Sequence, residues 1–120
     1  MAEFVLGIDG GTECVKAGVY DISGKTMGIS SSYYKTYHEH PGWAEQDLNE
    51  WRECLVEAIK DAIKKSGINT KDIIGVGHDG TSCSVIFVDE NDEPTRNAII
   101  WMDVRASEAV SYTHLRAHET

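Results

Sequence analysis

The feature that most constrains the fold is the segment GIDGGTECV at residues 7–15, where one carboxylate, Asp9, stands among three glycines. Two strand-like apolar runs, 4–9 and 15–21, flank the five residues that separate them. Runs this close together predict a β-hairpin. Glycine permits a tight turn and the close approach of another group, so we expect a loop with exposed backbone N–H groups.

The following segments predict a three-stranded meander and then a helix. The turn sequence DISGK at 21–25 introduces a third strand within 26–34. Asp47, with Glu50 three residues later, has the form of a capping box, and Gly67 is a natural helix end. The apolar residues between these caps form one stripe at steps of three and four, which we expect to face the core: Leu48, Trp51, Leu55, Ile59 and Ala62.

The rest of the chain predicts a return to the sheet. A strand at 72–77 after the helix requires a crossover connection. Further strands are expected at 84–88 and 98–101, separated by the turn sequence DENDEP, and DVRASEA begins a second helix. This order of elements indicates an α/β fold with a mixed sheet and flanking helices.

Composition and charge exclude several classes of protein. The formal net charge of −9 disfavours nucleic acid or an anionic membrane as a partner. No run approaches the roughly 18 apolar residues of a membrane span, and the N-terminus lacks the pattern of a secretory signal. The three cysteines, Cys14, Cys54 and Cys83, have no metal-ligand spacing and are typical of reduced thiols, so we expect a cytoplasmic protein.

The loop after the first strand predicts a phosphate site. Its exposed amides could hold phosphate oxygens, and Asp9 could hold a hydrated Mg²⁺, which prefers carboxylate, water and phosphate ligands. Thr12 adds a hydroxyl and Lys16 a positive charge. No Gly-Lys-Ser/Thr follows as in a P-loop, and a strand rather than a helix follows the glycines, unlike the dinucleotide fingerprint. A purely structural hairpin remains the alternative.

Three blocks in order, GIDGGTECVKAGVYDISGK, HPGWAEQDLNEW and GVGHDGTSCSVIFVDENDEPTRNAIIWMDVRA, resemble the N-terminal part of an FGGY-family carbohydrate kinase. The resemblance implies the actin-like, ribonuclease-H-like ATPase fold and transfer of the γ-phosphoryl group of ATP to a sugar or polyol hydroxyl. It implies that Asp9 is the Mg²⁺-associated carboxylate, and that the phosphate contacts come from Gly10, Gly11, Thr12 and Lys16.

The resemblance also implies where the sugar binds. The form of GHDGTSCS at 77–84 is similar to the ribulokinase-like branch, which makes Asp79 the leading contact to a sugar hydroxyl and Thr81 the second. In WMDVRA, Trp101 and Asp103 match positions near the sugar, and Arg105 is expected to pair with Asp103. Trp43 and Glu45 are expected only to pack at the helix entry. A ketopentose such as ribulose is therefore the expected substrate.

The same resemblance implies what this chain does not hold. Residues 1–110 are expected to be part of the first kinase domain. Separately, SYTHLRAHET at 111–120 resembles a translated adapter peptide, and a true helical end is the alternative. If the tail is adapter-derived, His114 and His118 form no metal site. The general-base Asp is expected beyond residue 120, so the fragment is expected to lack kinase activity. The alternatives are a non-catalytic actin-like binding module and a hydrolase on the same fold. A homodimer is compatible with the full-length protein.

Overall fold

The computed structural model describes the backbone of residues 2–119 and the side chains of 2–113. The chain forms two compact units, Met1–Lys35 with Asp47–Ser82, and Thr36–Gln46 with Cys83–Thr120. Of the helices in the described range, none combines the length and apolarity needed to cross a membrane.

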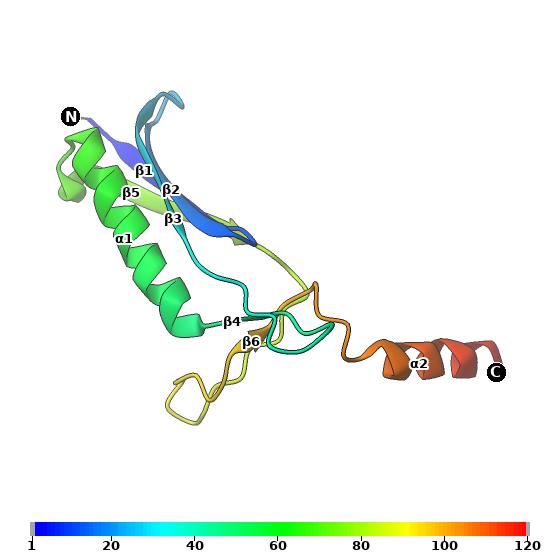
Figure 1. The fold of residues 1–120 in the computed structure, drawn as a ribbon. Coiled ribbons are helices and arrows are strands. Elements are labelled where there is room, and N and C mark those ends of the chain that lie inside the picture. Colours follow the sequence, from blue (N-terminus) through cyan, green and yellow to red (C-terminus); the bar gives the residue numbers. More distant parts are fainter. Residues whose placement is uncertain (1, 120) are drawn as a thin grey trace. The chain divides into compact units, whose positions relative to one another are not determined.

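The first unit is a four-stranded sheet covered on one face by a helix (Figure 1). Its strands are β1 (Phe4–Gly10), β2 (Cys14–Asp21), β3 (Thr26–Tyr33) and β5 (Ile73–Gly80), in the order β3-β2-β1-β5. The first three pair antiparallel, and β5 joins β1 in parallel. The predicted meander and the crossover return are therefore confirmed, but β5 runs three residues further than predicted and includes Asp79.

Local chemistry explains the turn between β2 and β3. One carboxylate oxygen of Asp21 accepts hydrogen bonds from the backbone N–H groups of Ser23 and Lys25, both at 2.9 Å. Gly24 has φ of +90°, a left-handed conformation that suits a residue without Cβ. These contacts close the turn without help from distant parts of the chain.

Helix α1 (Leu48–Ser66) begins and ends at the predicted residues. Asp47 accepts from the backbone N–H of Asn49 at 2.8 Å, and Gly67, with φ of +67°, donates to the carbonyl of Ile63. The helix packs against β2 and β3. Of the predicted stripe, Leu55, Ile59 and Ala62 contact the core, and Ala58, which the stripe omitted, is fully buried.

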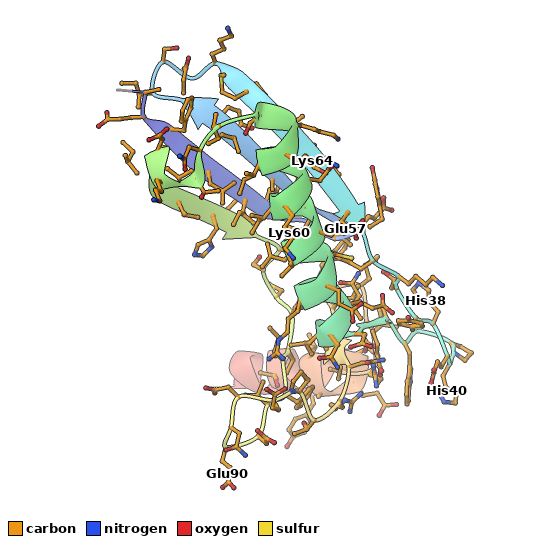
Figure 2. All side chains as sticks on the ribbon, turned by 90° about the vertical axis from the view of Figure 1, so that its left-hand side faces the viewer. His38, His40, Glu57, Lys60, Lys64 and Glu90 are labelled. Carbon is orange, nitrogen blue, oxygen red and sulfur yellow. The ribbon has the colours of Figure 1, made fainter. Side chains whose placement is uncertain are left out.

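Two hydrogen bonds fasten α1 to β3. The buried hydroxyl of Ser30 donates to Asp61 at 2.6 Å, and that of Ser32 donates to Glu57 at 3.0 Å. The bond from Ser30 is the main reason that the pKa of Asp61 lies below its ordinary value. Figure 2 shows Glu57 on α1 together with Lys60 and Lys64, whose side chains are exposed.

The second unit has little regular structure. Its strands β4 (Glu45–Gln46) and β6 (Ala98–Ile99) pair antiparallel, and α2 spans Ser107–Glu119. The turn at 89–94 forms as predicted, with Asp89 accepting from two backbone N–H groups, those of Asn91 and Glu93.

The predicted strand at 84–88 is wrong. Val85 and Val88 make only isolated bridges, to Ile99 and Pro94. The strand predicted at 98–101 also ends early, at Ile99, because the chain turns at residues 101–102, where the N–H of Asp103 donates to the carbonyl of Ile100 at 2.9 Å. Apolar content had suggested strands here, but neither segment has a neighbour to pair with along its whole length.

Candidate functional site

Three charged residues lie in one row across strands β2, β1 and β5, close to the end of the sheet that carries the glycine loop. Asp9 on β1 is the register partner of Lys16 on β2 and of Asp79 on β5. Side chains alternate between the faces of a strand, and Leu6 and Ala17 face the core beneath α1. Asp9 and Lys16 therefore project from the opposite face of the sheet, where all three side chains are exposed.

The neighbouring row consists of glycines. Gly7 is the register partner of both Gly18 and Gly77, so strands β2, β1 and β5 all lack a side chain at this position. The result is a hollow of about 380 Å³ beside the charged row. A Cβ on Gly18 would lie 2.4 Å from the hydroxyl of Tyr20, which shows how closely that ring covers the glycine. The hollow is lined by Gly7, Ile8, Asp9, Lys16, Gly18, Tyr20, Gly77, His78 and Asp79.

The glycine loop at 10–13 lies at the end of the same strands. The N–H of Gly11 donates to the carbonyl of Cys14 at 2.9 Å and so closes the turn. The amide of Gly11 is therefore used within the turn, while the expectation of exposed N–H groups elsewhere in the loop stays a prediction. Gly11 leaves this part of the loop without a side chain, and Thr12 follows it.

Thr81 has a partner that the sequence did not indicate. It donates its backbone N–H at 2.9 Å and its hydroxyl at 3.1 Å to the carbonyl of Gly10. A second residue, Tyr34, donates its hydroxyl to the carbonyl of Gly11. Tyr34 was missed because it stands at the end of the predicted strand range 26–34, where nothing in the local sequence marks it as a neighbour of the loop.

Asp103, in the second unit, has a nearly buried carboxylate with 4% of its side chain exposed. It accepts from the backbone N–H of Ala44 at 2.8 Å and from the guanidinium of Arg105 at 2.6 Å. The Arg105 guanidinium holds the pKa of Asp103 far below its ordinary range, with the Ala44 N–H acting in the same direction. The expected pairing of Arg105 with Asp103 is confirmed.

Arg105 joins two segments of the second unit. Its guanidinium also contacts the Glu45 carboxylate at 2.7 Å and lies 3.9 Å from the centre of the Trp43 ring. Arg96 reaches the same Glu45 carboxylate at 2.9 Å. Glu45 and Trp43 thus hold residues 96–105, and the expectation that they only pack at the helix entry is wrong.

Trp101, close in sequence to this ion cluster, is about half exposed, at 53%. An exposed indole face is suited to packing against the C–H surface of a sugar. Its assignment as a sugar contact stays a prediction. For Asp103, the partners described above favour a structural role in holding this segment.

The charged row fits a magnesium ion shared with phosphates. Within residues 2–113, no three His, Cys, Asp or Glu side chains gather as a metal-binding group. Mg²⁺ is usually held by one or two carboxylates together with water and substrate phosphates. Asp9, exposed at the end of β1, supplies a ligand of that kind. The expectation about His114 and His118 lies outside the described side chains.

Comparison with known proteins agrees with this geometry. Residues 4–118 match the model of the FGGY family of carbohydrate kinases, N-terminal domain. The chain is 40% identical over 105 residues to a xylulose kinase of Staphylococcus epidermidis, covering 88% of this chain and 21% of the relative. It is 34% identical over 110 residues to the L-xylulose/3-keto-L-gulonate kinase of Escherichia coli, covering 92% of this chain and 22% of that relative.

Solved structures give the same result. The gluconate kinase of Lactobacillus acidophilus superimposes with a TM-score of 0.88 at 29% identity, over 97% of this chain and 23% of that one. The ligand-bound xylulose kinase of the same organism superimposes with a TM-score of 0.86 at 30% sequence identity. The match covers 95% of this chain and 23% of that one. The actin-like fold is confirmed, and the chain spans about a fifth of the length of its relatives. The chain belongs to the FGGY family of carbohydrate kinases and corresponds to its N-terminal domain.

Proposed function

We propose that this chain forms the phosphate-binding part of an ATP-dependent kinase that phosphorylates a hydroxyl of a ketopentose or a related sugar. The observation that carries the proposal is the row Lys16–Asp9–Asp79, which lines a hollow beside a glycine loop in a member of a carbohydrate kinase family. Phosphoryl transfer depends mostly on positioning and on neutralising phosphate charge, and this row supplies both signs of charge.

The phosphate side of the site consists of Asp9, Lys16 and the loop. Asp9 would hold Mg²⁺, which neutralises charge on the phosphate oxygens. Lys16, adjacent to Asp9 on β2, would contact a phosphate directly. Gly10 and Gly11 leave the first half of the loop without side chains, and Thr12 would donate its hydroxyl at the tip.

The sugar side starts at Asp79. Its carboxylate is exposed in the hollow and can accept hydrogen bonds from sugar hydroxyl groups. Trp101, in the second unit, stays a predicted sugar contact because of its exposed indole. Thr81 would act indirectly, because it holds the carbonyl of Gly10 in the glycine loop. Asp103 would also act indirectly, because it holds the segment that carries Trp101. Two of the relatives described above are named for xylulose, a ketopentose, which supports that substrate class; the ribulokinase-like branch remains a prediction.

The general base and the adenosine pocket are proposed to lie in parts of the protein outside this sequence. Accordingly, the 120-residue chain by itself is predicted to show no sugar phosphorylation. The adapter-derived origin of residues 111–120 also stays a prediction, which resequencing of the gene would test.

A substrate panel tests the proposal. The complete protein would be assayed for ADP release with MgATP and a series of ketopentoses, glycerol and gluconate. We expect turnover with at least one ketopentose and a dependence on Mg²⁺. Sugar binding without any ADP release above the rate in the absence of sugar would instead identify a non-catalytic binding module.

A further inference from the structure

Two successive carbonyl groups of the glycine loop are held by side chains from different parts of the first unit. The carbonyl of Gly10 accepts from Thr81, which follows β5, and the carbonyl of Gly11 accepts from Tyr34, which follows β3. The N–H of Gly11 donates to Cys14. The peptide group between Gly10 and Gly11 is therefore fixed at both its carbonyl and its N–H.

The Thr81 contact joins the loop to the strand that carries Asp79. Both donors of Thr81, the backbone N–H and the hydroxyl, reach the same oxygen, at 2.9 and 3.1 Å. Gly10 also lies close to the β5 backbone, because a Cβ at this position would be 3.8 Å from the carbonyl oxygen of Asp79. The end of β5 and the start of the loop are thus joined by direct contacts.

Tyr34 is placed firmly enough to act as an anchor. Its backbone N–H donates to the carbonyl of Glu13 at 3.2 Å, and its ring lies 6.2 Å from that of Trp51, centre to centre. The side chain also packs against the core. Burial, with smaller contributions from Cys14, Cys54 and Asp9, raises the pKa of Tyr34 to about 12, so its hydroxyl keeps its proton at neutral pH.

The geometry of the peptide bond links this anchor to the ligand. A trans peptide is planar, and its C=O and N–H point in opposite directions. Because the Gly11 carbonyl points at Tyr34, the N–H of Thr12 must point away from Tyr34. We propose that Tyr34 and Thr81 are positioning residues that fix the orientation of the glycine loop, so that Thr12 meets the terminal phosphates of the nucleotide.

This inference rests on the proposed function for the identity of the ligand, but its structural half can be tested without any ligand. Tyr34→Phe removes the hydroxyl and keeps the ring. Tyr33→Phe is the matched control, because Tyr33 is its chain neighbour and is 73% exposed. Thr81→Val removes the side-chain donor, and Thr81→Ser restores it.

The first measurement is hydrogen–deuterium exchange of the complete protein without ligand, in peptides that cover residues 8–14. We expect exchange about tenfold faster in Tyr34→Phe and in Thr81→Val, with Tyr33→Phe and Thr81→Ser close to wild type. Equal exchange in Tyr34→Phe and Tyr33→Phe would overturn the inference, because the loop would then be rigid without the anchor.

The second measurement separates nucleotide from sugar. We expect Tyr34→Phe to raise the KM for ATP about tenfold while the KM for the sugar stays within about twofold. Faster exchange with unchanged KM for ATP would overturn the positioning role while leaving the proposed function intact. If the wild-type protein bound no MgATP and released no ADP, the proposed function would be rejected. The positioning role toward the nucleotide would then be rejected as well.

Discussion

Asp9 and Asp79 are register partners on the parallel strands β1 and β5, so two carboxylates from distant parts of the sequence stand side by side in one hollow. Lys16 flanks Asp9 on its other side. Two adjacent carboxylates repel each other, and a divalent cation or a hydroxyl donor between them would relieve that repulsion. The row therefore favours ligands that carry a metal ion, a hydroxyl group or both.

Removing the charge of Asp9 tests the metal role. We expect Asp9→Asn to lower the kcat of the complete protein by about a hundredfold or more, because charge neutralisation at the phosphates is a large part of catalysis. Sugar affinity, measured by calorimetry, should change little. Glu90→Gln, an exposed carboxylate in the turn of the second unit, is the control. Unchanged turnover would remove Asp9 from the mechanism.

Asp79 is expected to act on the sugar rather than the nucleotide. A hydrogen bond to a charged group contributes about 1.5–3 kcal/mol, so Asp79→Ala should raise the KM for the sugar about tenfold or more. The KM for ATP should stay near that of wild type, and selectivity among pentuloses should fall. If selectivity and sugar affinity were both normal in this variant, the assignment of Asp79 would be wrong.

Asp103 makes stability depend on acid pH. Its pKa in the folded protein is lowered chiefly by Arg105, while an unfolded aspartate titrates near a pKa of about 3.9. The unfolded chain therefore takes up a proton first, so the stabilisation is present above about pH 4 and is lost as the pH falls towards the folded pKa.

The corresponding variant is Asp103→Asn. At pH 7 we expect it to unfold with a free energy about 2 kcal/mol lower than wild type, since hydrogen bonds to a charged group are lost. The difference should shrink in denaturant titrations at pH 4 and then pH 3. A difference that did not depend on pH would show that the charge of Asp103 contributes nothing.

Gly28 is expected to be irreplaceable for packing. A Cβ at this position on β3 would lie 2.4 Å from the carbonyl oxygen of Ala62 and 2.6 Å from the backbone nitrogen of Ser66, both in α1. A helix backbone cannot move aside as a side chain can, so Gly28→Ala should cost about 2 kcal/mol or more. Gly75→Ala is the control, because nothing lies within 4 Å of its added Cβ. Chemical denaturation of both variants gives the comparison, and equal midpoints would refute this reading of the contact.

Much of the first unit could be predicted from the sequence because its signals are local. Asp21 and Gly24 close their own turn, and Asp47 and Gly67 cap α1 with contacts to residues two to four positions away. The strand at 84–88 failed for the opposite reason. Whether an apolar segment becomes a strand depends on a partner with free backbone groups, and the residues of the segment do not reveal one.

The sequence by itself determined the hairpin, the capped helix and, through three ordered blocks, the kinase family. Only the tertiary structure decided that Asp79 stands beside Asp9, that Thr81 and Tyr34 hold the carbonyls of the glycine loop, and that Asp103 accepts the N–H of Ala44. Each of these contacts joins segments that are far apart in the chain or depends on how they pack. Short-range propensities carry no information about such contacts, because register across a crossover is set by the packing of the whole sheet.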